Sequence, residues 1–187
     1  MYGKVQYAQI SSLGHCYGLE AYLNVWDPNV TSTGEFSTSQ VWISSGLLIN
    51  TSTMEAGWTQ DGYKTGCANA ACGFVQVSRK AAFGATTEPV SQYNRKQYET
   101  YMSIRKFPDT NWWLVYQDEQ VGYWPATSAK SLESMLHTLI LEERFRTQNQ
   151  AVFTHPHKWA VAIFQMKVME ELVLFGILGT LTKMEPL

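Results

Sequence analysis

The spacing of apolar residues changes near Ser128, and this change divides the chain into two parts. Before it, short stretches rich in aromatic residues alternate between apolar and polar side chains, separated by Gly, Pro, Asn and Asp. Such alternation is typical of half-buried strands. The predicted strands are residues 17–26, 36–44, 50–58, 73–78, 97–106, 111–117 and 121–125. Their number and spacing predict an all-β domain, an antiparallel sandwich or barrel.

The second part has a different pattern. Its apolar residues recur at helical spacing, at Leu132, Met135, Leu136, Leu139 and Ile140. Local propensity therefore predicts a tail that is either helical or disordered. The apolar run 159–181 is interrupted by four residues that are costly in lipid, Gln165, Lys167, Glu170 and Glu171, so we expect no membrane span.

Charge and motif content exclude several classes of function. The net charge is −2 and no stripe of Lys or Arg is present, so a nucleic-acid partner is not expected. His155 and His157 have no carboxylate or Cys at metal-ligand spacing. The sequence contains no phosphate-binding loop and no nucleophile elbow. His15 and Cys16 are neighbours whose side chains point to opposite faces of a strand, so they do not form a catalytic pair. We expect neither a metal nor a cofactor.

The features that bear on cellular compartment disagree. Residues 1–12 contain no apolar core of a signal peptide. However, Asn29 and Asn50 each begin a glycosylation sequon. Cys67 and Cys72 either close a small disulfide ring, which requires an oxidising compartment, or remain two thiols, and their spacing favours neither.

Glu55 is the acidic residue that stands out. It follows Met54 and precedes Ala56, Gly57 and Trp58 in an otherwise uncharged stretch. Desolvation in such a setting raises the pKa of a carboxyl group, which is how general acids are made. The alternative is a glutamate facing water on an edge strand, and composition alone favours that alternative.

Nine short motifs follow one another along the first part of the chain. They are Tyr17-Gly18, Asn24-Val25-Trp26-Asp27-Pro28, Ser39-Gln40-Val41-Trp42-Ile43, Glu55-Ala56-Gly57-Trp58, Thr65-Gly66-Cys67, Cys72-Gly73-Phe74-Val75-Gln76, Pro89-Val90-Ser91, Trp112-Trp113-Leu114 and Val121-Gly122-Tyr123-Trp124-Pro125. In sequence and in order they resemble the neprosin domain of plants, a family of secreted glutamic peptidases. The resemblance covers about residues 5–127.

The resemblance implies a β-sandwich of two antiparallel sheets and cleavage of peptides on the carboxyl side of proline. It implies two catalytic glutamates, of which the first corresponds to Glu55. One glutamate activates water, and the other protonates or stabilises the scissile carbonyl and the leaving group. The resemblance also implies secretion and a disulfide between Cys67 and Cys72. Trp42 and Trp58 are candidates for aromatic side chains of the substrate groove.

The chain departs from the family pattern in three places. The secretion signal and the N-terminal activation segment are missing. The stretch between Trp58 and Thr65 is shorter than in the family, so we expect a strand beside the active site to be deleted. The Gly-Gly-Glu-Val motif with the second glutamate is absent, so we expect the chain as written to be inactive.

A shift of reading frame accounts for the missing motif. Residues 134–145, reread one base out of register, allow a sequence that ends in Gly-Gly-Glu-Val, and residues 156–169 allow the family's C-terminal signature. At three positions the shifted codon allows a single amino acid. The pair Trp159–Ala160 gives Gly, Met166–Lys167 gives Glu, and Met169–Glu170 gives Gly. All three amino acids agree with the family. Residues 1–127 are then a partial domain and 128–187 an out-of-frame tail that leaves the sandwich incomplete. Glu142 and Glu143 are not equivalents of the family's second glutamate.

Two other functions are compatible with the aromatic content. A noncatalytic cell-wall or glycan-binding module would present an exposed, planar row of rings. A structural domain would use its surface only for a partner. Mostly buried tryptophans would disfavour the glycan-binding module, whereas an exposed row would favour it. The tryptophans to compare are Trp42, Trp58, Trp112, Trp113 and Trp124.

Overall fold

The structure is a computed structural model that describes residues 4–28, 30, 35–45, 52–60, 73–82, 84–129, 137–147 and 165–169. Within these residues every regular element is a strand. The strands are β1 (Lys4–Gly14), β2 (Gly18–Asn24), β3 (Phe36–Ser45), β4 (Ser52–Gln60), β5 (Val75–Gln76), β6 (Glu99–Lys106), β7 (Trp112–Tyr116), β8 (Glu119–Trp124), β9 (His137–Thr147) and β10 (Gln165–Met169).

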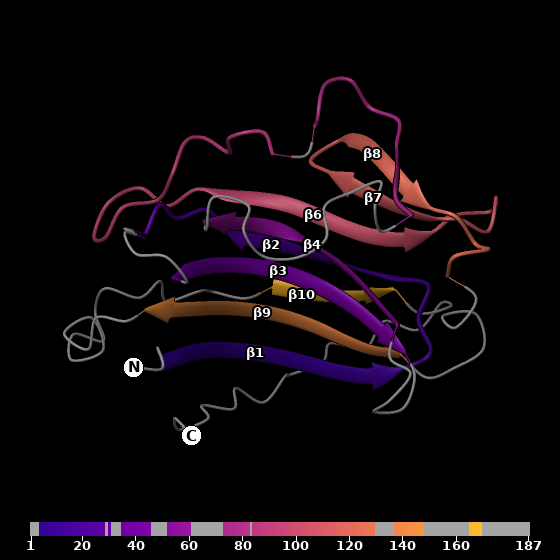
Figure 1. The fold of residues 1–187 in the computed structure, drawn as a ribbon, viewed down its shortest axis with the longest axis horizontal. Helices are drawn as coiled ribbons and strands as arrows, with labels where there is room; N and C mark the ends of the chain where they lie inside the picture. Colours follow the sequence, from indigo (N-terminus) through magenta and orange to yellow (C-terminus); the bar gives the residue numbers. More distant parts are fainter. Residues whose placement is uncertain are drawn as a thin grey trace.

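The strands form two antiparallel sheets, which confirms the all-β class and the sandwich. Sheet A has the order β1-β9-β3-β4, and sheet B has the order β10-β2-β6-β7-β8-β5. In Figure 1, β1, β9 and β3 lie side by side in the lower half, and β6, β7 and β8 lie in the upper half. The sheets meet where β3 contacts β2 and β6 and where β4 contacts β6.

One hydrophobic core lies between the sheets because alternate residues of each strand face inward. Val41 and Ile43 of sheet A and Leu19 and Ile104 of sheet B are fully buried in it. Trp112 of β7 is 1% exposed and is the largest fully buried side chain in the described part of the chain. The alternation of apolar and polar residues that predicted the strands therefore also places their apolar side chains in the core.

Residues 137–147 correct the sequence-based prediction for the tail. They form strand β9, not a helix, and β9 pairs with β1 on one side and β3 on the other. Leu139 and Leu141 face the core, with exposures of 1% and 0%, whereas Ile140 faces outward. Packing between two strands thus overrides the helical spacing of Leu139 and Ile140. The expectation that the tail supplies no strand to the sandwich is wrong for β9 and also for β10, which pairs with β2 in sheet B.

Ser91 ties a loop to sheet B, and its loss is expected to be costly. Its hydroxyl donates to Oδ1 of Asn24 (2.6 Å) and accepts from the backbone N–H of Tyr98 (2.8 Å). Because Ser91 is buried, Ser91→Ala leaves buried polar groups unsatisfied, and we expect a loss of about 1–3 kcal/mol of unfolding free energy. Urea denaturation measures this loss, with the exposed Ser11→Ala as the control. Equal stability of the two variants would contradict this role for Ser91.

Candidate functional site

Glu55 lies in the middle of β4, which is an edge strand of sheet A. Its side chain is on the face of sheet A that is turned away from sheet B, here called the outer face. On this face Glu55 is directly opposite Trp42 of β3, and Trp42 is directly opposite Ile140 of β9. The next row along the strands consists of Gly57, Gln40 and Glu142. Three strands therefore contribute residues to one continuous surface.

Of the two settings considered for Glu55, the structure shows the one that composition favoured. The side chain is exposed, and its Oε1 accepts a hydrogen bond from Oγ1 of Thr53 (3.0 Å). The alternative, a glutamate that faces water on an edge strand, is what the structure shows. A carboxylate in this position meets bulk water directly, and a peptide lying on the outer face can reach it.

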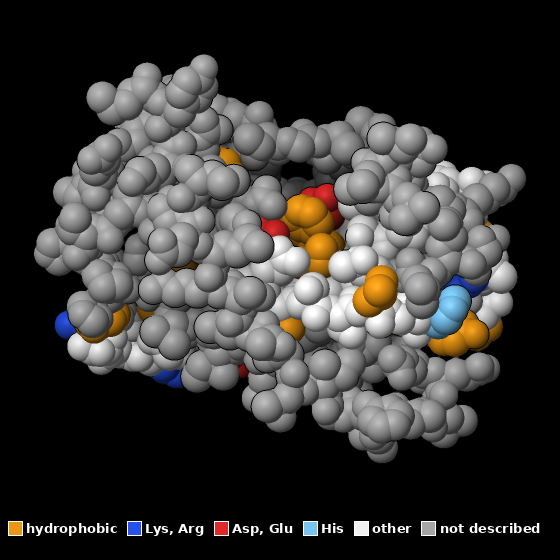
Figure 2. Space-filling view, turned by 90° about the horizontal axis from the view of Figure 1, so that it is seen from below, with side chains coloured by type: hydrophobic (Ala, Val, Ile, Leu, Met, Phe, Trp, Pro, Cys, Tyr) orange, Lys and Arg blue, Asp and Glu red, His pale blue; other side chains and the backbone are white. Residues whose placement is uncertain are grey.

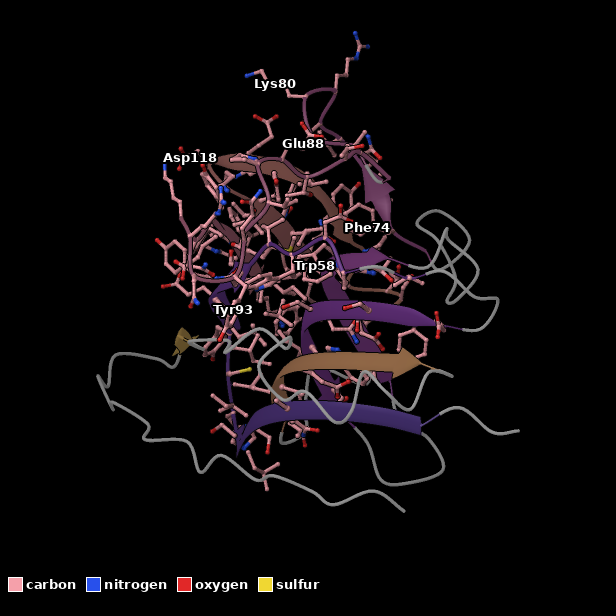
Figure 3. All side chains as sticks on the ribbon, turned by 90° about the vertical axis from the view of Figure 1, so that its left-hand side faces the viewer. Trp58, Phe74, Lys80, Glu88, Tyr93 and Asp118 are labelled. Atoms are coloured by element: carbon pink, nitrogen blue, oxygen red, sulfur yellow. The ribbon has the colours of Figure 1, made fainter. Side chains whose placement is uncertain are left out.

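Only one of the two predicted groove tryptophans shares the face of Glu55. Trp42 is half-buried on the outer face. Trp58 faces the interior, where it packs against the core and its Nε1 donates to the carbonyl of Asn24 (2.9 Å). Figure 3 shows Trp58 inside the molecule, while Lys80 lies at its periphery. Trp58 therefore holds β4 on the core, and of these two tryptophans it is Trp42 that shares the outer face with Glu55.

Glu142 is the residue of this face that sequence reasoning set aside. It is two strands from Glu55, and its side chain is only 3% exposed, although neighbouring outward residues such as Gln40 and Ile140 are half-buried. The strand register shows that Glu142 is on this face, because register determines which side chains share a face and the codon frame does not. Figure 2, which views the molecule from below, shows acidic side chains next to hydrophobic ones among the described residues.

Gly57 keeps β4 close to β3 beside the site. A Cβ atom built at Gly57 would lie 2.1 Å from the backbone oxygen of Ser39 and 2.6 Å from Cα of Gln40. These are backbone atoms of the neighbouring strand, so no side-chain rotation relieves the contact. Because Gly57 has no side chain, the row that contains Gln40 and Glu142 has no side chain at its position on β4.

Substituting Gly57 tests this close approach. We expect Gly57→Ala to lower the unfolding free energy by about 1–3 kcal/mol, as overpacking does elsewhere. Chemical denaturation gives the value, and Thr59→Ala, at an exposed position of the same strand, is the control. A Gly57→Ala variant as stable as the unmodified chain would show that β4 can shift away from β3.

The tryptophans do not form the flat platform expected of a glycan-binding module. Trp112 is fully buried, and Trp58 and Trp124 pack against the core. Trp113 is half-buried, and its ring is tilted by 40° from that of Tyr123 and by 49° from that of Phe107. Flat sugar rings stack on parallel faces, so this arrangement disfavours the glycan-binding alternative.

A second polar group lies on the opposite face of the sandwich. On the outward face of sheet B, the hydroxyl of Tyr101 donates to Glu20 (2.7 Å), and Arg105 lies 3.6 Å from the same carboxylate. Burial, followed by the hydrogen bond to Glu20, raises the pKa of Tyr101. These contacts join β2 to β6, so we interpret the group as structural.

Several predicted residues lie outside the described part of the chain. They are Asn29, Asn50, Cys67, Cys72, His155 and His157. Among the residues that are described, no three His, Cys, Asp or Glu side chains are grouped as metal ligands would be. Within the same residues, no helix has the length and apolarity needed to cross a membrane.

Comparison with protein families places this site within a known domain. The family model described as Neprosin matches residues 33–136, more than half of the 187-residue chain. The matched segment includes Trp42, Glu55 and Gly57, and it ends immediately before β9.

Proposed function

Because the chain belongs to the neprosin family, we propose that its function is that of a glutamic endopeptidase cleaving peptides after proline. Glu55 is the catalytic carboxylate of this proposal. The observation that carries it is the position of Glu55, exposed at the centre of β4 and beside Trp42 within the matched segment. Trp42 offers an aromatic surface against which a proline ring packs.

The proposed chemistry needs a carboxylate that water can reach. Glu55 meets this requirement because it is exposed, and Thr53 holds one of its oxygens through a hydrogen bond. A positioned carboxylate of this kind removes a proton from water as the water attacks a carbonyl carbon. A second carboxyl group is needed to donate a proton to the leaving nitrogen.

The chain as written lacks the family's second glutamate, and we attribute this to a frame change. In this proposal residues 1–127 are the partial domain and 128–187 are translated out of frame. The three forced residues support it, as does the end of the family match at residue 136. Sequencing the transcript across the codons for 122–145 tests it. An extra base, a missing base or an alternative splice junction that restores Gly-Gly-Glu-Val is the expected result, whereas an unaltered frame contradicts it.

The family placement suggests an extracellular protein. We therefore include in the proposal secretion, a disulfide between Cys67 and Cys72, and glycosylation at Asn29 and Asn50. A disulfide forms and persists in an oxidising compartment, such as the secretory pathway in which proteins are also glycosylated. Peptide mass mapping of protein from a secreting host, before and after reduction, is expected to find the two cysteines linked.

Cleavage of a defined peptide tests the proposed function. The chain as written and a frame-corrected chain are each incubated with a peptide that contains one internal proline. We expect the frame-corrected chain to cut after the proline, and the chain as written to do so far more slowly. If the folded, frame-corrected chain cuts no peptide, the proposed function is wrong.

A further inference from the structure

We propose that the outer edge of β4 is an interaction surface and that its partner is the β4 strand of a second copy of the chain. β4 is the last strand of sheet A, and within the described residues no strand pairs with its other edge. Alternate residues of an edge strand direct their N–H and C=O groups away from the sheet, where another strand can pair with them. This association needs no peptide and is independent of the proposed peptidase activity.

The composition of β4 leaves this edge unprotected. Natural edge strands avoid pairing with other chains by being short, by carrying Lys or Pro, or by containing a bulge. Of the four edge strands in the described part of the chain, β5 has only two residues, and β1 and β10 carry Lys4 and Lys167. β4 has nine residues, contains neither Lys nor Pro, and pairs with β3 without a register shift. β4 is therefore the edge most open to a further strand.

Solvent reaches the backbone of β4 near its middle. Gly57 consists of backbone atoms only and is exposed, although a Cβ atom built on it would lie 2.1 Å from the backbone oxygen of Ser39 on β3. Its contact with solvent therefore comes from the sides turned away from β3. Ala56 and Trp58 pack against the core but remain half-buried. A strand added beside β4 would cover both the backbone groups and this apolar margin of the core.

The sequence of β4 selects one register for a pair of identical strands. An antiparallel pair centred on Ala56 joins all nine residues, with Ser52 opposite Gln60 of the second copy. In this register Glu55 is opposite Gly57 of the second copy, which has no side chain, so like charges are not directly opposed. The two Glu55 side chains are diagonal neighbours on an exposed face, where solvent screens their repulsion. A pair centred on Glu55 would instead place the two carboxylates directly opposite each other.

The remaining pairs in this register are compatible with close packing. On the outer face, Thr53 is opposite Thr59 of the second copy, and both are exposed. On the inner face, Met54 is opposite Trp58 of the second copy, a favourable combination of a thioether with an aromatic ring. Two-fold symmetry makes each of these pairs occur twice. The two copies of sheet A then form one continuous sheet.

Sedimentation of the chain as written, without added peptide, tests this association. We expect the sedimentation coefficient to rise with concentration toward the value for two copies. The double variant Thr53→Lys/Thr59→Lys places like charges in both outer-face pairs, whereas Thr53→Lys/Thr59→Glu places opposite charges there. We expect the dissociation constant of the first variant to exceed that of the second by about 10-fold or more. Both variants carry Thr53→Lys, so a difference between them does not come from that change alone.

Ser11→Lys is the control, because Ser11 is exposed on β1 at the opposite edge of sheet A. It is expected to leave the association unchanged. Thermal midpoints are measured in parallel, and since Thr53 and Thr59 are exposed we expect every variant to stay folded.

Four outcomes would overturn the proposal. The first is an unmodified chain that sediments as a single copy at every concentration. The second is equal association of Thr53→Lys/Thr59→Lys and Thr53→Lys/Thr59→Glu. The third is dissociation by Ser11→Lys, which would place the contact on β1. The fourth is growth beyond two copies, because a two-fold contact closes at two.

Discussion

In the frame-corrected chain, Glu55→Gln is expected to lower kcat by about 10²- to 10⁴-fold, the range that a positioned general base contributes. Glutamine keeps the size of the side chain and its hydrogen bond from Thr53, but it cannot accept a proton from water. Because Glu55 is exposed, the substitution leaves no buried group without a partner, and the thermal midpoint is expected to stay unchanged. Steady-state cleavage of the proline-containing peptide measures the effect.

Two controls make this result specific. Glu99→Gln removes an exposed carboxylate from sheet B and is expected to leave kcat unchanged. Thr53→Ala removes the hydrogen bond to Glu55 and is expected to lower kcat only modestly, since the carboxylate remains. If Glu55→Gln and Glu99→Gln cleave the peptide equally well, Glu55 is not the catalytic carboxylate.

Trp112→Ala is expected to have the largest effect on stability, a loss of about 3–5 kcal/mol of unfolding free energy. Trp112 is 1% exposed and lies in the single core that joins the two sheets. Removing the indole leaves a cavity that neighbouring strands cannot close without breaking their pairing. Since total stabilities are commonly about 5–15 kcal/mol, this loss is a large fraction of the unfolding free energy, and guanidinium denaturation measures it.

Trp113 provides the matched control on the same strand. It faces outward, is half-buried and contacts Tyr123 and Phe107 at the surface. Trp113→Ala is expected to cost clearly less than Trp112→Ala in guanidinium denaturation. A reversed order of the two variants would mean that the core does not lie on the side of β7 that the structure shows.

Local alternation was sufficient to predict β2, β3, β4, β6, β7 and β8 close to their observed bounds. In β3, for example, inward Val41 and Ile43 alternate with outward Gln40 and Trp42. The predicted strands 97–106 and 111–117 form the antiparallel pair β6–β7, and in the turn between them the N–H of Thr110 bonds to the carbonyl of Phe107 (2.9 Å). Patterns of this kind are contained within a few neighbouring residues, so the sequence reveals them directly.

Pairing between distant segments was not predictable in the same way. β1 was not predicted, although it pairs along its length with β9, more than a hundred residues later. The segment that forms β9 was expected to be helical or disordered, because Leu139 and Ile140 fit a helical spacing. In the strand, Leu139 and Leu141 face the core, an outcome fixed by the flanking strands β1 and β3. Such long-range contacts leave little trace in local sequence.

The candidate site was predicted only in part. Glu55 was identified, and it faces water, as composition favoured, because its apolar neighbours Met54 and Ala56 point to the other face of the strand. Trp58 was named as a groove candidate with the resemblance and instead faces the core. Glu142 was set aside on its codon frame, whereas register alone places it on the face of Glu55.

Cleavage in water labelled with oxygen-18 is the most direct test of the central claim, that Glu55 directs water to the carbonyl of a substrate proline. The frame-corrected chain and its Glu55→Gln variant are incubated with the proline-containing peptide, and the fragments are analysed by mass spectrometry. The account predicts a fragment that ends in proline and carries the heavy oxygen in its new carboxyl group, and no such fragment from the variant. Fragments that end at other residues, or a labelled proline terminus that persists in Glu55→Gln, would contradict it.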